Sequence, residues 1–139
     1  MFLPGERYYP AFLDIRGRLV VIIGGGTVAE ETVGTMLDFG ADVLVIAPQI
    51  TPGIDLLVAE GRIEHEQRGY IRGDLAGAFI VFSATDCVET DRAVYQEAEG
   101  MGCLVSIAEE PCLGNFITPV HERHSELMAA IDLDHLKES

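Results

Sequence analysis

The stretch VVIIGGGTVAE, residues 20–30, limits the fold of this chain more than any other feature. An apolar run meets three glycines and then continues as an amphipathic segment. The apolar residues of that segment recur on one helical face: Ala29, Val33, Met36 and Leu37. A short apolar run that ends at glycine is typical of a strand buried on both faces. The stretch therefore predicts a strand, a tight turn and a helix in immediate succession.

The same alternation continues along the chain. The expected strands are residues 19–23, 43–47, 62–66, 79–83 and 103–107, and the expected helices after the first are residues 51–60 and 89–99. Thr51 suits the cap of the first of these helices, and the second should turn Ala93, Val94 and Ala98 inward. This spacing predicts an α/β fold, a Rossmann-like parallel sheet of about five strands with helices on both faces.

The rhythm changes after Pro111. Residues 116–121 and 126–131 read as two extended segments joined by a polar turn. We therefore divide the chain into a Rossmann-like domain, residues 1–112, and a short C-terminal β extension with a tail, residues 113–139. Strand edges and apolar side chains in this extension favour a homodimer.

The charge balance excludes several classes of partner. The chain has 139 residues with 23 acidic and 9 basic side chains, which gives a formal net charge of −14. This field repels nucleic acid and anionic membranes. No apolar run approaches the length of about 20 residues that spans a bilayer, and the start, MFLPGERYYP, lacks the order of a signal peptide. We expect a cytoplasmic protein.

The cysteines and histidines predict neither a disulfide framework nor a metal site. Cys87, Cys103 and Cys112 form no CxxC pair, so reduced and at least partly buried thiols are expected. His121 and His124 suit a polar hairpin turn better than a pair of metal ligands. His65 suits a strand surface.

The glycines match a nucleotide-binding pattern. Gly24, Gly26 and Ala29 satisfy G-x-G-x-x-A at the end of the first strand. In such a loop the first glycine forms the tight turn, the second lets a pyrophosphate approach the backbone, and the alanine keeps helix and strand close. The helix N-terminus then offers free N–H groups to the phosphates. A dinucleotide site is predicted, and the alternative is a structural turn or a relic of such a site.

The end of the second strand departs from that pattern. An acidic residue usually binds the ribose hydroxyls there, whereas this chain has Ala47, Pro48 and Gln49. Gln49 or backbone groups would then serve the ribose. No arginine lies beside them to hold a 2′-phosphate, which favours NAD over NADP as the cofactor.

Four further segments extend the pattern beyond the glycines. They are YPAFLDIRGR at 9–18, APQ at 47–49, ATD at 84–86 and PCLGNFITP at 111–119. With these segments in order, the chain resembles the siroheme synthase N-terminal family, whose members are precorrin-2 dehydrogenases and in some cases also sirohydrochlorin ferrochelatases. The resemblance implies a tetrapyrrole substrate, precorrin-2, which is oxidised with NAD to sirohydrochlorin in siroheme biosynthesis, with iron insertion as a second activity in some members.

The resemblance also implies roles for particular residues. The cofactor would be lined by Gly24, Gly25, Gly26, Thr27, Val28, Ala47, Pro48, Gln49, Ala84, Thr85 and Asp86. The family places a catalytic aspartate just after the fifth strand, two residues before a proline, and that position here is Glu109. Glutamate can still accept a proton, although its extra methylene moves the carboxylate by about 1 Å. Glu110 is a neighbouring candidate, and solvated loop carboxylates are the alternative for both.

Departures from the family keep a second function open. A basic pair typically continues the glycine-loop helix, but this chain has Glu31 and Thr32. The arginines that a polycarboxylate substrate would need are spread along the chain: Arg7, Arg16, Arg18, Arg68, Arg72, Arg92 and Arg123. The chain also stops where relatives continue into a helical domain, so it is a short form or a partner supplies that part. The alternative function is a non-catalytic NAD(P)-binding or interaction paralogue of the family.

Overall fold

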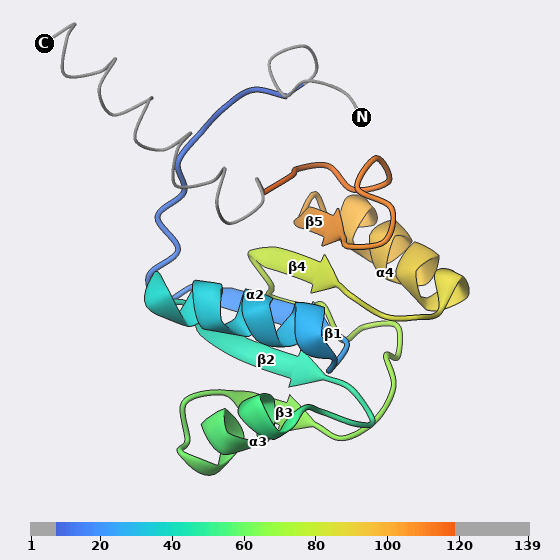
Figure 1. The fold of residues 1–139 in the computed structure, drawn as a ribbon. Helices are drawn as coiled ribbons and strands as arrows, with labels where there is room; N and C mark the ends of the chain where they lie inside the picture. Colours follow the sequence, from blue (N-terminus) through green and yellow to red (C-terminus); the bar gives the residue numbers. More distant parts are fainter. Residues whose placement is uncertain (1–7, 119–139) are drawn as a thin grey trace, which may run out of the picture.

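The alternation of strands and helices builds a five-stranded parallel sheet (Figure 1). The computed structural model describes residues 8–118. The strands are β1 (Leu19–Ile23), β2 (Asp42–Ile46), β3 (Glu64–Glu66), β4 (Ile80–Ser83) and β5 (Leu104–Ile107), in the order β3-β2-β1-β4-β5. Every neighbouring pair is parallel. The predicted Rossmann-like α/β fold is therefore confirmed.

Within residues 8–118, three helices cover the two faces of this sheet. They are α2 (Thr27–Asp38), α3 (Pro52–Ala59) and α4 (Val88–Gly100). Side chains of α2 and α3 pack on one face, whereas α4 and Leu75, from the segment before β4, pack on the other. Figure 1 shows α2 lying across the sheet and α3 beside the edge strand β3.

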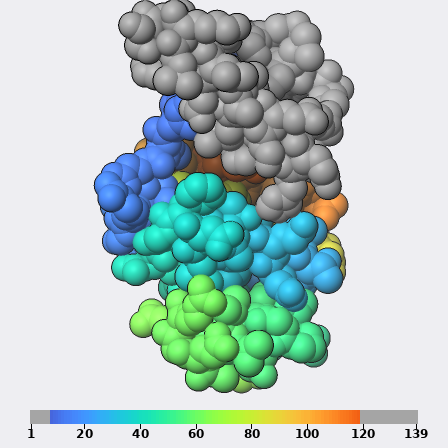
Figure 2. Space-filling view, turned by 60° about the vertical axis from the view of Figure 1, so that its left-hand side comes forward, coloured from blue at the N-terminus to red at the C-terminus, as the bar shows by residue number. Residues whose placement is uncertain are grey.

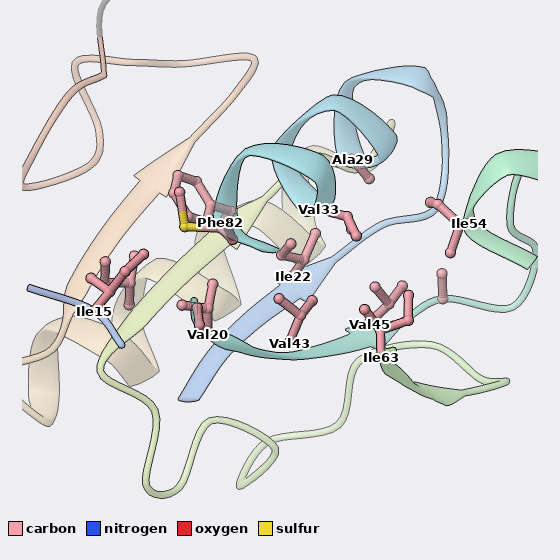
Figure 3. Close-up of a cluster of buried hydrophobic side chains, with 14 residues drawn as sticks. Ile15, Val20, Ile22, Ala29, Val33, Val43, Val45, Ile54, Ile63 and Phe82 are labelled. Atoms are coloured by element: carbon pink, nitrogen blue, oxygen red, sulfur yellow. The ribbon is translucent and has the colours of Figure 1, made fainter. Parts of the chain in front are cut away.

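The central strand β1 holds the core together from both sides. Val20 and Ile22 belong to the cluster under α2 and α3, and Val21 and Ile23 belong to the cluster under α4. All four side chains are at most 2% exposed. In Figure 3, Ala29 and Val33 of α2 lie on the helix face turned toward the sheet. A continuous apolar strand is stable only when both faces are covered, as they are here.

The first turn of α3 follows the predicted capping pattern. Thr51 is the N-cap residue, and its hydroxyl oxygen accepts a hydrogen bond from the Ile54 N–H at 3.1 Å. Pro52 occupies the first helical position, where its missing N–H costs nothing. This cap fixes where the segment after β2 ends and α3 begins.

Two expectations about side-chain burial are wrong. On α4 the inward stripe consists of Asp91, Val94 and Ala98, and Ala93 is exposed. Ala93 lies about 100° around the helix from Val94, so the two cannot share a narrow stripe. The cysteines also differ from the expectation of partial burial, because Cys87 and Cys112 are exposed and only Cys103 is buried. Burial raises the pKa of the Cys103 thiol.

The outer edge of β5 is partly covered by Asn115. Its side-chain oxygen accepts a hydrogen bond from the Val105 N–H at 2.8 Å, and its own N–H donates to the Val105 carbonyl at 2.9 Å. Its side-chain NH₂ also donates to the Cys103 carbonyl at 2.8 Å. One residue thereby satisfies edge groups that a further strand would otherwise pair.

Several predictions fall largely or wholly outside the described residues, and so they stay predictions. They are the extended segments 116–121 and 126–131 and the pair His121 and His124. The domain boundary at residue 112 also stays a prediction.

The loop between β3 and β4 is held by two acidic side chains. Glu97 of α4 accepts hydrogen bonds from the Tyr70 hydroxyl and from the Gly73 N–H. Asp74 accepts from both terminal nitrogens of Arg68, at 2.8 and 2.9 Å, and from the Ile71 N–H at 2.7 Å. Hydrogen bonds to these two carboxylates therefore hold the loop in its conformation.

We expect Asp74→Asn to lower the free energy of unfolding modestly at neutral pH, because the amide cannot replace the ion pair with the partly exposed Arg68. The hydrogen bonds from Arg68 lower the pKa of the Asp74 carboxyl from its usual 3.8. This contribution is therefore present above that value and is lost as pH falls through the lower folded-state pKa. Urea unfolding of both proteins should show a stability difference that shrinks from about pH 7 to about pH 3. A difference that stays constant would contradict the assignment.

Candidate functional site

The first two loop glycines lie where two other backbone segments come close. A Cβ on Gly24, whose φ is +123°, would lie 2.3 Å from the Ala84 carbonyl oxygen. A Cβ on Gly25 would lie 2.0 Å from the Gln49 carbonyl oxygen. No side chain fits at either position, so the loop is held between the turn after β4 and the segment after β2.

Gly26 differs from its neighbours because nothing lies within 4 Å of the position that its Cβ would take. It is the N-cap residue of α2, with φ −86° and ψ −163°, and it provides no side-chain cap. The first N–H groups of a helix have no partner within the helix. The open space at Gly26 and the uncapped turn at Thr27 and Val28, both exposed, thus form a cradle that fits a pyrophosphate. Ala29 is fully buried, as the close packing of helix and strand requires.

The segment after β2 borders a cavity of about 420 Å³. The lining residues are Pro48, Gln49, Ile50, Asp55, His65 and Gln67. Ala47 itself is buried below the glycine loop, so its methyl group supports Gly25. His65 Nε2 lies 2.8 Å from the Ala47 carbonyl oxygen, which ties β3 to this segment. Sequence reasoning placed His65 on a strand surface and missed Asp55, whose only signal was its position in the first turn of the next helix.

The turn after β4 is organised by a buried carboxylate. Asp91 of α4 is 4% exposed, and its Oδ1 accepts hydrogen bonds from the Ser83 hydroxyl at 2.7 Å and the Thr85 hydroxyl at 2.6 Å. Thr85 Oγ1 also accepts a hydrogen bond from the Cys87 N–H at 3.2 Å. Asp86 is exposed at the tip of this turn. Asp91 was not predicted, although its spacing of three residues before Val94 could have indicated it.

The segment with Glu109 follows β5 at the same edge of the sheet. The Ala108 N–H donates to the Ser83 carbonyl at 2.8 Å, so the end of β5 stays paired to the end of β4. Because β4 lies between β1 and β5, the glycine loop and Glu109 are about two strand spacings, or about 10 Å, apart. Glu109 is exposed. The carboxyl ends of these strands therefore gather the glycine loop, the 84–86 turn and Glu109, the usual place for a ligand in an open α/β sheet.

Arg16 and Arg18 do not gather with these groups, and Arg68 is paired with an aspartate. Arg16 and Arg18 precede β1, so they lie at the amino ends of the strands, whereas the glycine loop lies at the carboxyl ends. Arg16 pairs with Asp14 at 2.8 Å, and the Arg18 guanidinium lies 3.8 Å from the centre of the Phe79 ring. Arg68 is engaged by Asp74 in the loop before β4.

Two features are absent from residues 8–118. No group of three or more His, Cys, Asp and Glu side chains in that range could hold a metal ion. No helix in the same range combines the length and the apolar character needed to cross a membrane.

This geometry agrees with the sequence family that matches the chain. Residues 11–120 match a family described as "Putative NAD(P)-binding". The chain belongs to this family. The expected cofactor is thereby confirmed as a nicotinamide dinucleotide, and the cradle at Gly26 fits its pyrophosphate.

Its relatives include siroheme synthases. The chain is 35% identical over 122 residues to a siroheme synthase of Methylobacillus flagellatus, covering 88% of this chain and 26% of that protein. It is 35% identical over 124 residues to siroheme synthase 3 of Aeromonas hydrophila, covering 89% of this chain and again 26% of that protein. The chain thus spans about a quarter of the length of these curated relatives.

A solved structure gives the same result. The structure named SirC, precorrin-2 dehydrogenase, matches with a TM-score of 0.73 and 28% identity, over 81% of this chain and 55% of that one. The resemblance to the siroheme synthase N-terminal family is therefore confirmed.

Proposed function

We propose that this chain is an NAD-dependent precorrin-2 dehydrogenase that forms sirohydrochlorin in siroheme biosynthesis. The observation that carries the proposal is the open, uncapped N-terminus of α2 at Gly26, placed at the same edge of the sheet as Glu109. The similarity to siroheme synthases and to a precorrin-2 dehydrogenase structure supports the choice of substrate.

The roles of the chain's own residues follow from their places around the edge. Gly24 and Gly25 let the loop fold tightly between its neighbours, and Gly26 leaves room for the pyrophosphate. Asp91, through the Thr85 hydroxyl, keeps the 84–86 turn in place beside Gly24. A bound nicotinamide dinucleotide supplies the hydride acceptor.

Oxidation of the tetrapyrrole also releases a proton, for which a base must be near. Glu109 is the carboxylate at the position where the family has its aspartate, and its exposure leaves it accessible to a large substrate. Because glutamate is longer than aspartate, the substrate must lie slightly farther from the backbone here than it would with an aspartate at this position. We assign Glu109 the role of proton acceptor.

Glu109→Gln should lower kcat by about 100-fold or more while leaving the affinity for NAD unchanged, because the amide keeps the size but cannot accept the proton. The measurement is anaerobic absorbance of the whole chain with precorrin-2 and NAD, which follows NADH and sirohydrochlorin together. Glu110→Gln is the matched control, since it removes the same charge one residue away, and it should retain the wild-type rate. Equal loss in both variants would contradict a specific role for Glu109.

The alternative is a non-catalytic NAD(P)-binding or interaction module. One observation favours it: Arg16, Arg18 and Arg68 are each engaged by another side chain, which leaves little of their charge for a polycarboxylate substrate. NAD binding by calorimetry without any turnover of precorrin-2 would support this alternative. Ferrochelatase activity, a homodimer and a cytoplasmic location stay predictions, tested by iron insertion, light scattering and cell fractionation.

A further inference from the structure

The cavity beyond β2 contains an acidic side chain that the glycine-loop pattern does not supply. Gln49 follows β2, Asp55 belongs to the first turn of α3, and His65 belongs to β3. At about 420 Å³ the cavity lies within the size range of small-molecule sites. Figure 2 shows the residues of α3 and β3, in green, at one end of the described part beside α2. Three elements thus contribute polar groups to one hollow.

No lysine or arginine belongs to this lining. The nearest arginine in sequence, Arg68, donates hydrogen bonds to both oxygens of Asp74 and to the Gly69 carbonyl. Both terminal nitrogens of its guanidinium are therefore engaged by Asp74. A phosphate group that entered the cavity would meet the Asp55 carboxylate without a lining cation beside it.

The backbone around Asp55 is held in place by hydrogen bonds, and its side chain is exposed. The Thr51 cap fixes the start of α3, and the Asp55 N–H donates to the Thr51 carbonyl at 2.9 Å. The Thr51 N–H in turn donates to the Gly25 carbonyl at 3.0 Å, which connects this helix start to the glycine loop. Backbone hydrogen bonds thus connect the start of α3, which carries Asp55, to the glycine loop.

Resting on the proposed function, we propose that Asp55 selects NAD over NADP. Its carboxylate accepts a hydrogen bond from the 2′-hydroxyl of the adenosine ribose and repels a phosphate at the same position. An acidic residue at the end of the second strand usually has this role. Here Gln49 occupies that end, and α3 supplies the carboxylate from the other side of the cavity.

The test compares NAD and NADP affinities by titration calorimetry of the whole chain. The wild type should bind NAD at least about tenfold more tightly than NADP. Asp55→Asn should weaken NAD binding, strengthen NADP binding and bring the two dissociation constants within about threefold of each other. Glu60→Gln is the control, because it removes the same charge at the exposed C-cap of α3, outside the cavity, and should keep the wild-type ratio.

The outcomes separate this inference from the proposed function. Equal binding of both dinucleotides by the wild type, or an unchanged ratio in Asp55→Asn, would overturn the role of Asp55 and leave dinucleotide binding intact. A change in Glu60→Gln as large as that in Asp55→Asn would overturn it too, since the cause would be long-range charge. Failure of the wild type to bind either dinucleotide would overturn both proposals.

Discussion

Gly26→Ala is expected to weaken NAD binding by about 100-fold without lowering the stability of the fold. The added methyl group meets nothing within 4 Å, and the φ of −86° and ψ of −163° suit any residue. The methyl does, however, occupy the space through which a pyrophosphate must approach the N–H groups of α2. Calorimetry with NAD and thermal unfolding of the same samples measure the two effects separately.

Gly34→Ala is the matched control for this prediction. Gly34 lies inside α2, and its added Cβ also meets nothing within 4 Å. Alanine in a helix interior should stabilise the protein by about 0.5–1 kcal/mol and leave NAD affinity unchanged. If Gly26→Ala bound NAD as the wild type does, the glycine loop would be a structural turn, and the dinucleotide site would have to lie elsewhere.

Gly24→Ala is expected to lower the free energy of unfolding by about 3 kcal/mol or more. Two costs combine at this position. The φ of +123° is strained for a residue with a side chain, and the new Cβ would lie 2.3 Å from the Ala84 carbonyl oxygen. Because Ala84 is held by a hydrogen bond from its N–H to the Ile23 carbonyl at 2.8 Å, it cannot move away without breaking the end of the sheet.

Urea unfolding measures this loss, and Gly61→Ala separates its two causes. Gly61 also has a positive φ, +74°, but nothing lies within 4 Å of its Cβ position. Its substitution should cost about 1–2 kcal/mol through backbone strain alone. Losses of equal size in the two variants would show that contact with Ala84 does not contribute, and that the loop relaxes more freely than its hydrogen bonds indicate.

Much of the fold could be predicted because its signals are local. The run from Leu19 to Ile23 coincides with β1, and Thr51 caps α3 as expected. The failures are also physical in origin. The sequence favoured Ala93 as an inward residue of α4, but Asp91 is buried instead. Its carboxylate accepts hydrogen bonds from the hydroxyls of Ser83 and Thr85, which lie at and just after the end of β4.

The candidate site was predicted in part for the same reason. The glycine loop could be predicted because its residues are adjacent in sequence. Glycine is required at Gly24 and Gly25 because a Cβ at either position would clash with a neighbouring backbone segment. Asp55 was missed because an aspartate in the first turn of a helix has an ordinary explanation in the helix dipole. Only its place in the cavity with Gln49 and His65 indicates a second role.

By itself the sequence determined the alternating elements, the parallel sheet and the loop that fits a dinucleotide, because periodicity and glycine spacing act over a few residues. The tertiary structure decided which distant groups meet. The order β3-β2-β1-β4-β5 places only β4 between β1 and β5, so Glu109 lies two strands from the glycine loop. Strand order depends on how crossover helices pack across the whole sheet, and no local pattern records that packing.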